Sequence, residues 1–185
     1  PPDPAIREQV AAIIADVEAR GDAALVDIVR RFDDPSFTAG RIRVDIEEIA
    51  EAKRTVDPDL IASLEVAAAQ VRSLAERVRG ADVAAGLPLG QRITVRSIPV
   101  ASVGAYVPGG RAAYPSSLIM AVVPAQVAGV ERIAVASPVG EDGRVAAPIL
   151  AAAGLLGITE VYAVGGPGVI AAFAAGTESI PAVSV

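Results

Sequence analysis

The sequence predicts an α/β fold in which helices cover both faces of a parallel sheet, preceded by an amino-terminal helical segment. Residues 1–90 hold 17 acidic and 11 basic side chains, whereas residues 91–185 hold 5 of each. The charged half is typical of solvated amphipathic helices, and the second half alternates β-rich runs with Ala-rich runs. Because its strand-like runs are almost continuously apolar, this alternation indicates a parallel sheet that is buried on both faces.

Helix signals are clearest in the first half. Asp3-Pro4 is an N-cap followed by proline at the first helical position, and Asp57-Pro58 repeats that arrangement before a longer helix. Gly21-Asp22 ends the first helix and begins a second, which Asp33-Asp34-Pro35 closes. Residues 80–92 are rich in Gly and Pro and are predicted to form a loop.

The second half supplies the predicted sheet and its covering helices. Strands are expected over 93–100, 102–107, 132–137 and 160–164, and helices over 117–127, 148–156 and 169–175. Pro124 is expected to break or kink the first of these helices. These elements divide the chain into a helical segment (1–92) and an α/β domain (93–185). The strand-like run IPAVSV at 180–185 has no stop signal, so we expect the chain to be truncated after Val185.

Composition excludes several classes of protein. A net charge of −6 and a pI near 4.7 argue against a nucleic-acid partner, which needs a basic surface. The chain lacks His and Cys, so by itself it is a poor candidate for a zinc site or a Ser-His triad. Its apolar stretches are shorter than the ~20 residues that cross a bilayer, and it opens without a signal peptide. A soluble, cytoplasmic protein without a membrane partner is expected.

The stretch VGAYVPGGR (103–111) is the first candidate site. It indicates a strand that ends at Tyr106 and leads into a type II turn over residues 107–110, with Gly109 supplying a positive φ. Open α/β sheets bind ligands at this carboxyl edge, where an aromatic ring can stack on a flat ligand. A tight turn with a packed tyrosine explains the same residues, and the sequence alone favours this simpler interpretation.

Two further motifs follow strands or helices. The glycines of VGGPGV (164–169) would let backbone N–H groups and a helix N-terminus face an anion, although a close strand-to-helix turn is the simpler explanation. In GTESIP (176–181), Gly176 is expected to end a helix, and Glu178 is either a site carboxylate or a surface charge. The acidic pairs Asp33-Asp34 and Glu47-Glu48 are most simply helix-end and surface charges.

Several of these blocks, in this order, resemble the amino-terminal part of the histidinol dehydrogenase family. They are ADVEARGDAALVDIVRRFD (15–33), VGAYVPGGRAAYPSSLIMAVVPAQVAGVERIAVASP (103–138), ILAAAGLLGITEVYAVGG (149–166) and GTESIP. The resemblance covers essentially the whole chain. It implies an incomplete Rossmann-like sheet and a zinc-dependent, NAD-linked homodimer that oxidises L-histidinol to L-histidine through histidinal, in histidine biosynthesis.

The resemblance also implies which site residues belong to this chain. Tyr106 matches the tyrosine of the family's Y-[VI]-P-G-G motif, which contacts NAD. Gly168 stands where the family has a second NAD contact, a glutamine, and Ser102 stands where an arginine is usual. Catalytic residues and zinc ligands are expected outside this segment, with none in the chain, so the segment alone would be inactive. The departures leave open a paralogue that oxidises another small alcohol, and a catalytically inert binding domain is the further alternative.

Overall fold

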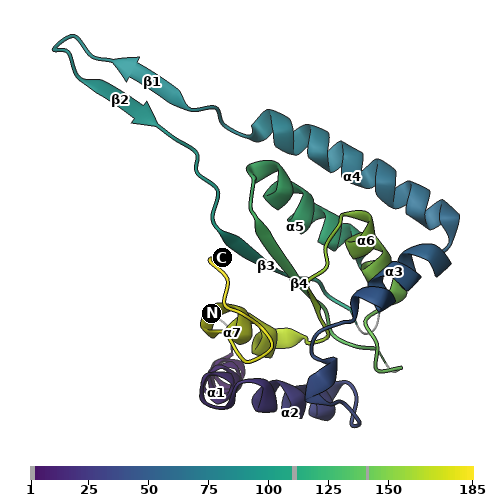
Figure 1. Ribbon diagram of the computed structural model, residues 1–185. Helices are drawn as coiled ribbons and strands as arrows, with labels where there is room; N and C mark the ends of the chain where they lie inside the picture. Colours follow the sequence, from purple (N-terminus) through teal and green to yellow (C-terminus); the bar gives the residue numbers. More distant parts are fainter. Residues whose placement is uncertain (1–2, 110–111, 141) are drawn as a thin grey trace.

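The computed structural model describes residues 3–109, 112–140 and 142–185 (Figure 1). Its helices are α1 (Pro4–Arg20), α2 (Asp22–Phe32), the 3₁₀ turn η1 (Ala39–Arg41), α3 (Ile46–Thr55), α4 (Pro58–Val78), α5 (Pro115–Ala128), α6 (Ala147–Leu155) and α7 (Gly166–Ala175). Its strands are β1 (Val83–Gly86), β2 (Arg92–Val95), β3 (Ser102–Tyr106), β4 (Arg132–Ala136) and β5 (Val161–Tyr162).

The predicted helix starts in the first half are confirmed. The side chains of Asp3 and Asp57 each accept a hydrogen bond of 2.9 Å from the backbone N–H two residues later, at the starts of α1 and α4. Helix α3 was not predicted from the sequence. It begins at the N-cap Asp45, whose side chain accepts from the backbone N–H of Glu47, and Glu47 and Glu48 occupy its first turn.

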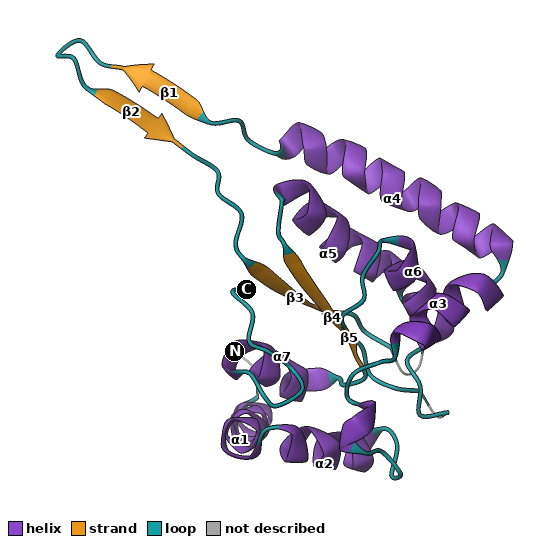
Figure 2. Cartoon of the chain, viewed as in Figure 1, coloured by secondary structure: helices purple, strands orange, loops and turns teal. Residues whose placement is uncertain are grey.

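The predictions for residues 80–100 are partly wrong. Strands β1 and β2 pair antiparallel and project from the body as a hairpin (Figure 2), so the predicted loop contains a strand and the predicted strand over 93–100 does not join the parallel sheet. The register places Val83 opposite Val95 and Ala85 opposite Ile93. Strand β1 reads VAAG, and Ala and Gly are depleted in strands, so its sequence carries almost no strand signal.

The parallel sheet contains β3, β4 and β5 in the order β3-β4-β5. The C-terminal segment continues the hydrogen-bonding pattern on the free side of β3. Val185 N–H donates to Ser102 O (3.3 Å) and Val185 O accepts from Gly104 N–H (2.8 Å), which is the pattern of a parallel pair. Strands β4 and β5 thus lie on one side of β3, and the C-terminal segment, which is not a strand of the sheet, lies along the other side. This placement matches the side on which a doubly wound Rossmann sheet carries its next strand.

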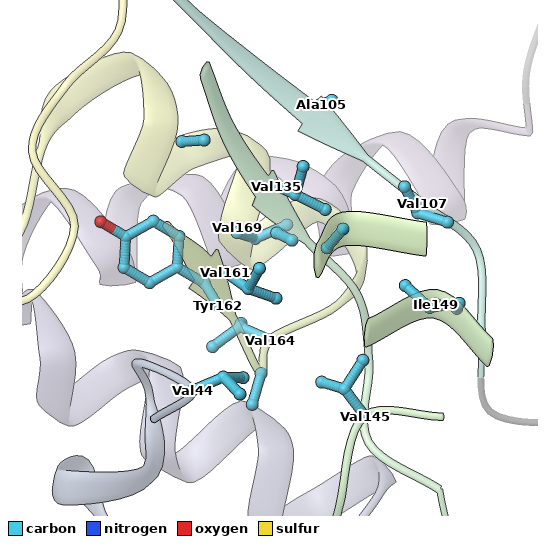
Figure 3. Close-up of a cluster of buried hydrophobic side chains, with 14 of the residues drawn as sticks. Val44, Ala105, Val107, Val135, Val145, Ile149, Val161, Tyr162, Val164 and Val169 are labelled. Atoms are coloured by element: carbon cyan, nitrogen blue, oxygen red, sulfur yellow. The ribbon is translucent and has the colours of Figure 1, made fainter. Parts of the chain in front are cut away.

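Helices cover both faces of this sheet, as predicted. Helices α5 and α6 lie on one face with α3 and α4 outside them, and α7 lies on the other face with α1 and α2 beyond it (Figure 1). The side chains between these layers are apolar and almost completely buried (Figure 3). Helix α5 continues through Pro124, so the predicted break is absent, and Gly129 in the left-handed region ends the helix.

The proposed division into residues 1–92 and 93–185 remains a prediction. Its boundary falls at the first residue of β2, Arg92. None of the helices in the described part of the chain combines the length and the apolar character that a bilayer crossing requires.

Candidate functional site

A pocket of about 330 Å³ opens at the carboxyl edge of the parallel sheet. The described residues that line it are Ile13, Ile28, Phe32, Asp33, Tyr106, Pro138, Gly165, Gly166 and Pro167. The ends of all three strands contribute, and helices α1 and α2 form the opposite wall. Its volume lies at the lower end of the ~300–1,000 Å³ that is usual for small-molecule sites. Open α/β sheets bind their ligands at the carboxyl ends of the strands.

Tyr106 lies at the rim of this pocket, as the last residue of β3. Its side chain is 37% exposed, whereas the next residue, Val107, is fully buried. Its ring is therefore not enclosed in the core. The simpler prediction of a packed tyrosine is only partly right, because the residue is also open to solvent and to the pocket.

Glycine is required beside this rim because of close packing, not because of the predicted turn. Gly109 is not in the left-handed region, so the expected type II turn is wrong there, and its last residue, Gly110, lies outside the described residues. A Cβ atom on Gly109 would lie 2.7 Å from Ser137 Oγ. In the same way, a Cβ atom on Gly165 would lie 2.7 Å from Pro138 Cβ. The two glycines allow the strand ends to converge on the pocket.

Ser137, directly after β4, carries the most unusual polar group of this region. Its side chain is fully buried, and its hydroxyl has no hydrogen-bond partner among the described residues. Most buried hydroxyls in proteins are paired. The hydroxyl of Ser137, behind the loop at 107–109, is therefore available to donate a hydrogen bond to a ligand or to a water molecule at this edge.

The glycine-rich turn after β5 begins helix α7 at the pocket. Gly165 is the N-cap residue, Gly166 has a φ of 65°, and no side chain caps the helix. The backbone N–H groups of the first turn lack partners within the helix, and such groups favour anions. The turn therefore combines the two interpretations that the sequence left open: it is a close strand-to-helix connection, and its helix N-terminus borders a pocket.

Asp33 is the lining residue that the sequence analysis missed. The pattern Asp33-Asp34-Pro35 indicated a helix end, and Asp33 is indeed the C-cap residue of α2. Only the packing of α2 against α7 directs one of these two acids to the pocket, and no local sequence signal distinguishes them. Burial raises the pKa of the Asp33 carboxyl above its usual value. Asp34 instead accepts hydrogen bonds from Ser36 and Arg41, and these lower the pKa of its carboxyl.

Gly168 is buried in α7 and is not among the residues that line the pocket. A Cβ atom at this position would lie 2.9 Å from Ile28 Cδ1 and 3.5 Å from Leu25 Cδ2. Helix α2 therefore fills the space that a longer side chain at position 168 would need. Ser102 lies at the other end of β3, where its hydroxyl accepts from Ser184 N–H (2.9 Å).

The GTESIP block holds helix α2 in place. Glu178 Oε2 accepts from the backbone N–H of Asp22 (2.9 Å), and Ser179 N–H donates to Asp22 Oδ1 (3.2 Å). Gly176 ends α7 with a φ of 81°, as predicted. Glu178 is therefore a cap for a distant helix. It does not line the pocket that contains Tyr106.

A second polar cluster lies in the sheet and has a structural explanation. Glu160 accepts from Arg132 Nη2 (2.6 Å) and from the hydroxyl of Tyr162 (2.6 Å). Burial opposes ionisation, but the hydrogen bonds from Arg132 and Tyr162 hold the pKa of the Glu160 carboxyl below its usual value. Burial, followed by the bond to Glu160, raises the pKa of Tyr162 to about 12. Arg132 also donates to Ala182 O (2.9 Å), so the cluster ties the C-terminal segment to the sheet.

The parallel strands, the two covered faces and the pocket at the carboxyl ends of the strands define a Rossmann-like α/β protein. A comparison with models of known protein families identifies the family. The family model for histidinol dehydrogenase matches residues 2–185, and the chain belongs to that family.

Curated relatives and a solved structure agree with this assignment. The chain is 45% identical over 177 residues to the histidinol dehydrogenase of Ruegeria pomeroyi, covering 96% of this chain and 41% of that protein. It is 45% identical over 178 residues to that of Geobacillus kaustophilus, covering 94% of this chain and 41% of the relative. The crystal structure of the Elizabethkingia anophelis enzyme superposes with a TM-score of 0.90 at 30% identity, over 96% of this chain and 41% of that one. The chain thus spans about 41% of the length of these relatives.

Proposed function

We propose that this chain is the NAD-binding amino-terminal part of a zinc-dependent dehydrogenase that oxidises L-histidinol to L-histidine through histidinal. Membership of the histidinol dehydrogenase family supports a role in histidine biosynthesis. The observation that carries the cofactor assignment is the pocket at the carboxyl ends of the parallel strands, with Tyr106 at its rim. We also propose a cytoplasmic location for the whole enzyme, as suits a biosynthetic dehydrogenase.

The residues of the pocket fit part of a dinucleotide. Phe32, Tyr106 and Pro138 offer flat apolar surfaces for a ring, and the glycines at 165 and 166 let backbone approach a ligand closely. The N-terminus of α7, which no side chain caps, is suited to a phosphate, and the hydroxyl of Ser137, without a partner among the described residues, lies behind the same edge. When bound, NAD supplies the hydride acceptor. In this proposal Tyr106 packs against a flat ring of the cofactor at the rim of the pocket, and the surrounding apolar side chains exclude water.

Zinc does not fit the residues of this chain. The sequence has neither His nor Cys, and within residues 3–109, 112–140 and 142–185 no three acidic side chains are grouped for a metal ion. We therefore assign the zinc ligands and the catalytic residues to the part of the enzyme outside this segment. It follows that the segment alone should not turn over substrate.

A different small alcohol is the second candidate for the substrate of the whole enzyme. Gly168 replaces the glutamine that the family resemblance leads one to expect, and Ile28 fills the adjoining space. The cofactor would therefore lose a polar contact and gain an apolar one. A change of this kind alters the position of the bound cofactor. Because the substrate reacts with the cofactor, it also alters where the substrate must lie in order to react.

We also propose that a second copy of the chain packs against the hairpin of β1 and β2, which would make the enzyme a homodimer. One face of the hairpin carries Val83, Ile93 and Val95, each more than half exposed. A two-stranded hairpin alone is at best marginally stable in water, so we expect another protein surface to cover this face. Residues 82–100 contain Arg92, Arg96 and Asp82, which pairs with Arg96 (3.4 Å), so this segment carries a charge of +1, whereas the whole chain carries −6. The hairpin is therefore complementary in charge to the body of another copy.

The proposed activity is tested with the full-length protein. Purified enzyme with zinc should form NADH from L-histidinol and should bind NAD in calorimetry. Tyr106→Phe should leave the fold intact and weaken NAD binding about 2- to 10-fold if the hydroxyl donates a hydrogen bond to the cofactor. No NADH at saturating histidinol would remove the substrate assignment, and a clear preference for another alcohol would favour the second candidate. An unchanged affinity for NAD in Tyr106→Phe would count against the hydroxyl contact.

A further inference from the structure

Asp33 is the single charged group among the described residues that line the pocket. It follows the last residue of α2, Phe32, and its side chain is half-buried. Among the described residues, no hydrogen bond or ion pair to its carboxylate is formed, whereas its neighbour Asp34 is bonded to Ser36 and Arg41. Its carboxylate is therefore available to accept hydrogen bonds from a ligand in the pocket.

The rest of the pocket restricts what that ligand can be. Apart from Asp33 and the hydroxyl of Tyr106, the described lining side chains are apolar or absent, because they belong to Ile, Phe, Pro and Gly. Such a wall accepts a flat ring, and a single carboxylate accepts hydrogen bonds from neutral hydroxyl groups next to that ring. A nucleoside combines these two features, since it joins a planar base to a sugar with a vicinal diol.

Doubly wound sheets that bind dinucleotides use an acidic residue for the ribose, and Asp33 offers one from a different element of the fold. In these folds an acidic residue near the end of the second strand accepts a hydrogen bond from the ribose 2′-hydroxyl. Here the second strand of the parallel sheet, β4, is followed by Ser137 and Pro138, neither of which is acidic. Pro138 and Asp33 line the same pocket, so the acid missing from the strand end is supplied by the helical layer.

We propose that the pocket holds the adenosine half of the cofactor, and that Asp33 binds the hydroxyls of the adenosine ribose and so selects NAD over NADP. This inference rests on the proposed cofactor site. A 2′-phosphate carries a charge of about −1.5 to −2, which the Asp33 carboxylate would repel at short range. The described lining residues include no Lys or Arg to offset that repulsion. Arg31 lies over the ring of Phe32 and lines the adjoining groove between α1 and α2, not this pocket.

The test measures binding of NAD and NADP separately, by calorimetry on the full-length protein. Wild-type enzyme should bind NAD at least about 100-fold more tightly than NADP. Asp33→Asn should weaken NAD binding about 10-fold or more and reduce the NAD-to-NADP preference by at least that factor, since a hydrogen bond to a charged group is lost and the repulsion is removed. Asp33→Glu keeps the charge and should still exclude NADP. Glu65→Gln, an exposed site on α4 remote from the pocket, removes the same charge and should change neither affinity.

The outcomes separate this inference from the proposed function. If wild-type enzyme does not bind NAD, the proposed function is wrong and this inference is wrong with it. If NAD binds and Asp33→Asn keeps the wild-type preference, the cofactor site stands and the role of Asp33 is overturned. Folding is checked by thermal denaturation. Because the folded-state pKa of Asp33 is raised, its ionised form costs stability at neutral pH, so Asp33→Asn should be at least as stable as wild type there.

Discussion

Glu178 and Asp22 are 156 residues apart in the sequence, and they are joined by a hydrogen bond at the start of helix α2. Glu178 Oε2 accepts from the backbone N–H of Asp22 at a distance of 2.9 Å. The N-cap residue of α2 is Gly21, which has no side chain of its own to cap the helix. A Cβ atom on Gly21 would lie 2.4 Å from Glu178 Oε2, so the glycine is what lets the carboxylate reach the helix. A motif near the end of the chain thus positions the helix that carries Ile28 and Asp33.

Replacement of Glu178 should destabilise the protein. Glu178→Ala removes the acceptor for an N–H group at a helix N-terminus and should lower the free energy of unfolding by about 0.5–2 kcal/mol, the usual cost of a lost cap. Glu178→Gln keeps an acceptor but removes the charge, and should cost less. Chemical denaturation measures both, with Glu131→Gln at an exposed site as the control. Equal stability of wild type and Glu178→Ala would show that the contact does not hold α2.

The cluster of Arg132, Glu160 and Tyr162 should make stability depend on pH. The folded-state pKa of Glu160 is lowered, so its contribution is fully present above the unfolded pKa of about 4.3 and is lost as the pH falls through the folded value. Glu160→Gln should therefore cost about 1–3 kcal/mol near pH 7, and the difference from wild type should shrink below about pH 4. Denaturation curves across this range test the prediction. A difference that is constant with pH would contradict it.

A glutamine at position 168 should clash with Ile28 on helix α2. Gly168→Gln alone forces Ile28 to move, and overpacking of this kind typically costs about 1–3 kcal/mol. Ile28→Ala in the same protein vacates the space that the glutamine needs. The double variant should then lose less stability than the sum of the losses of the two single variants, which is the loss expected if the two changes acted independently. Additive losses in thermal denaturation would mean that Ile28 does not occupy the space in question.

Polar substitutions on the apolar face of the hairpin should weaken association of two copies. Ile93→Ser with Val95→Ser removes two side chains that are each more than half exposed, so the isolated subunit should lose little stability. Light scattering of full-length protein should show a shift from dimer to monomer at low concentration. Thr94→Ser changes the opposite face of β2 and should leave the mass unchanged. A double variant that remains fully dimeric would exclude this face from the interface.

Local patterns determined much of the fold. The caps at Asp3 and Asp57, the glycine stops and the alternation of apolar runs predicted α1, α2, α4 and the three parallel strands, because these signals act within one or two helical turns. The hairpin was not predicted correctly, because VAAG has little strand propensity and its pairing with Arg92–Val95 is decided by the partner strand. Helix α3 was missed although Asp45 and Glu47 carry an ordinary capping signal.

The sequence by itself determined the class of fold, the family resemblance and the position of Tyr106 at the end of a strand. Only the tertiary structure decided what surrounds that tyrosine. Asp33 reaches the pocket, Gly168 lies beneath Ile28, and Glu178 caps α2, and each of these depends on how α2 packs against α7. Residues far apart in the chain meet there, and the packing of two helices is not encoded in the pattern of either one alone.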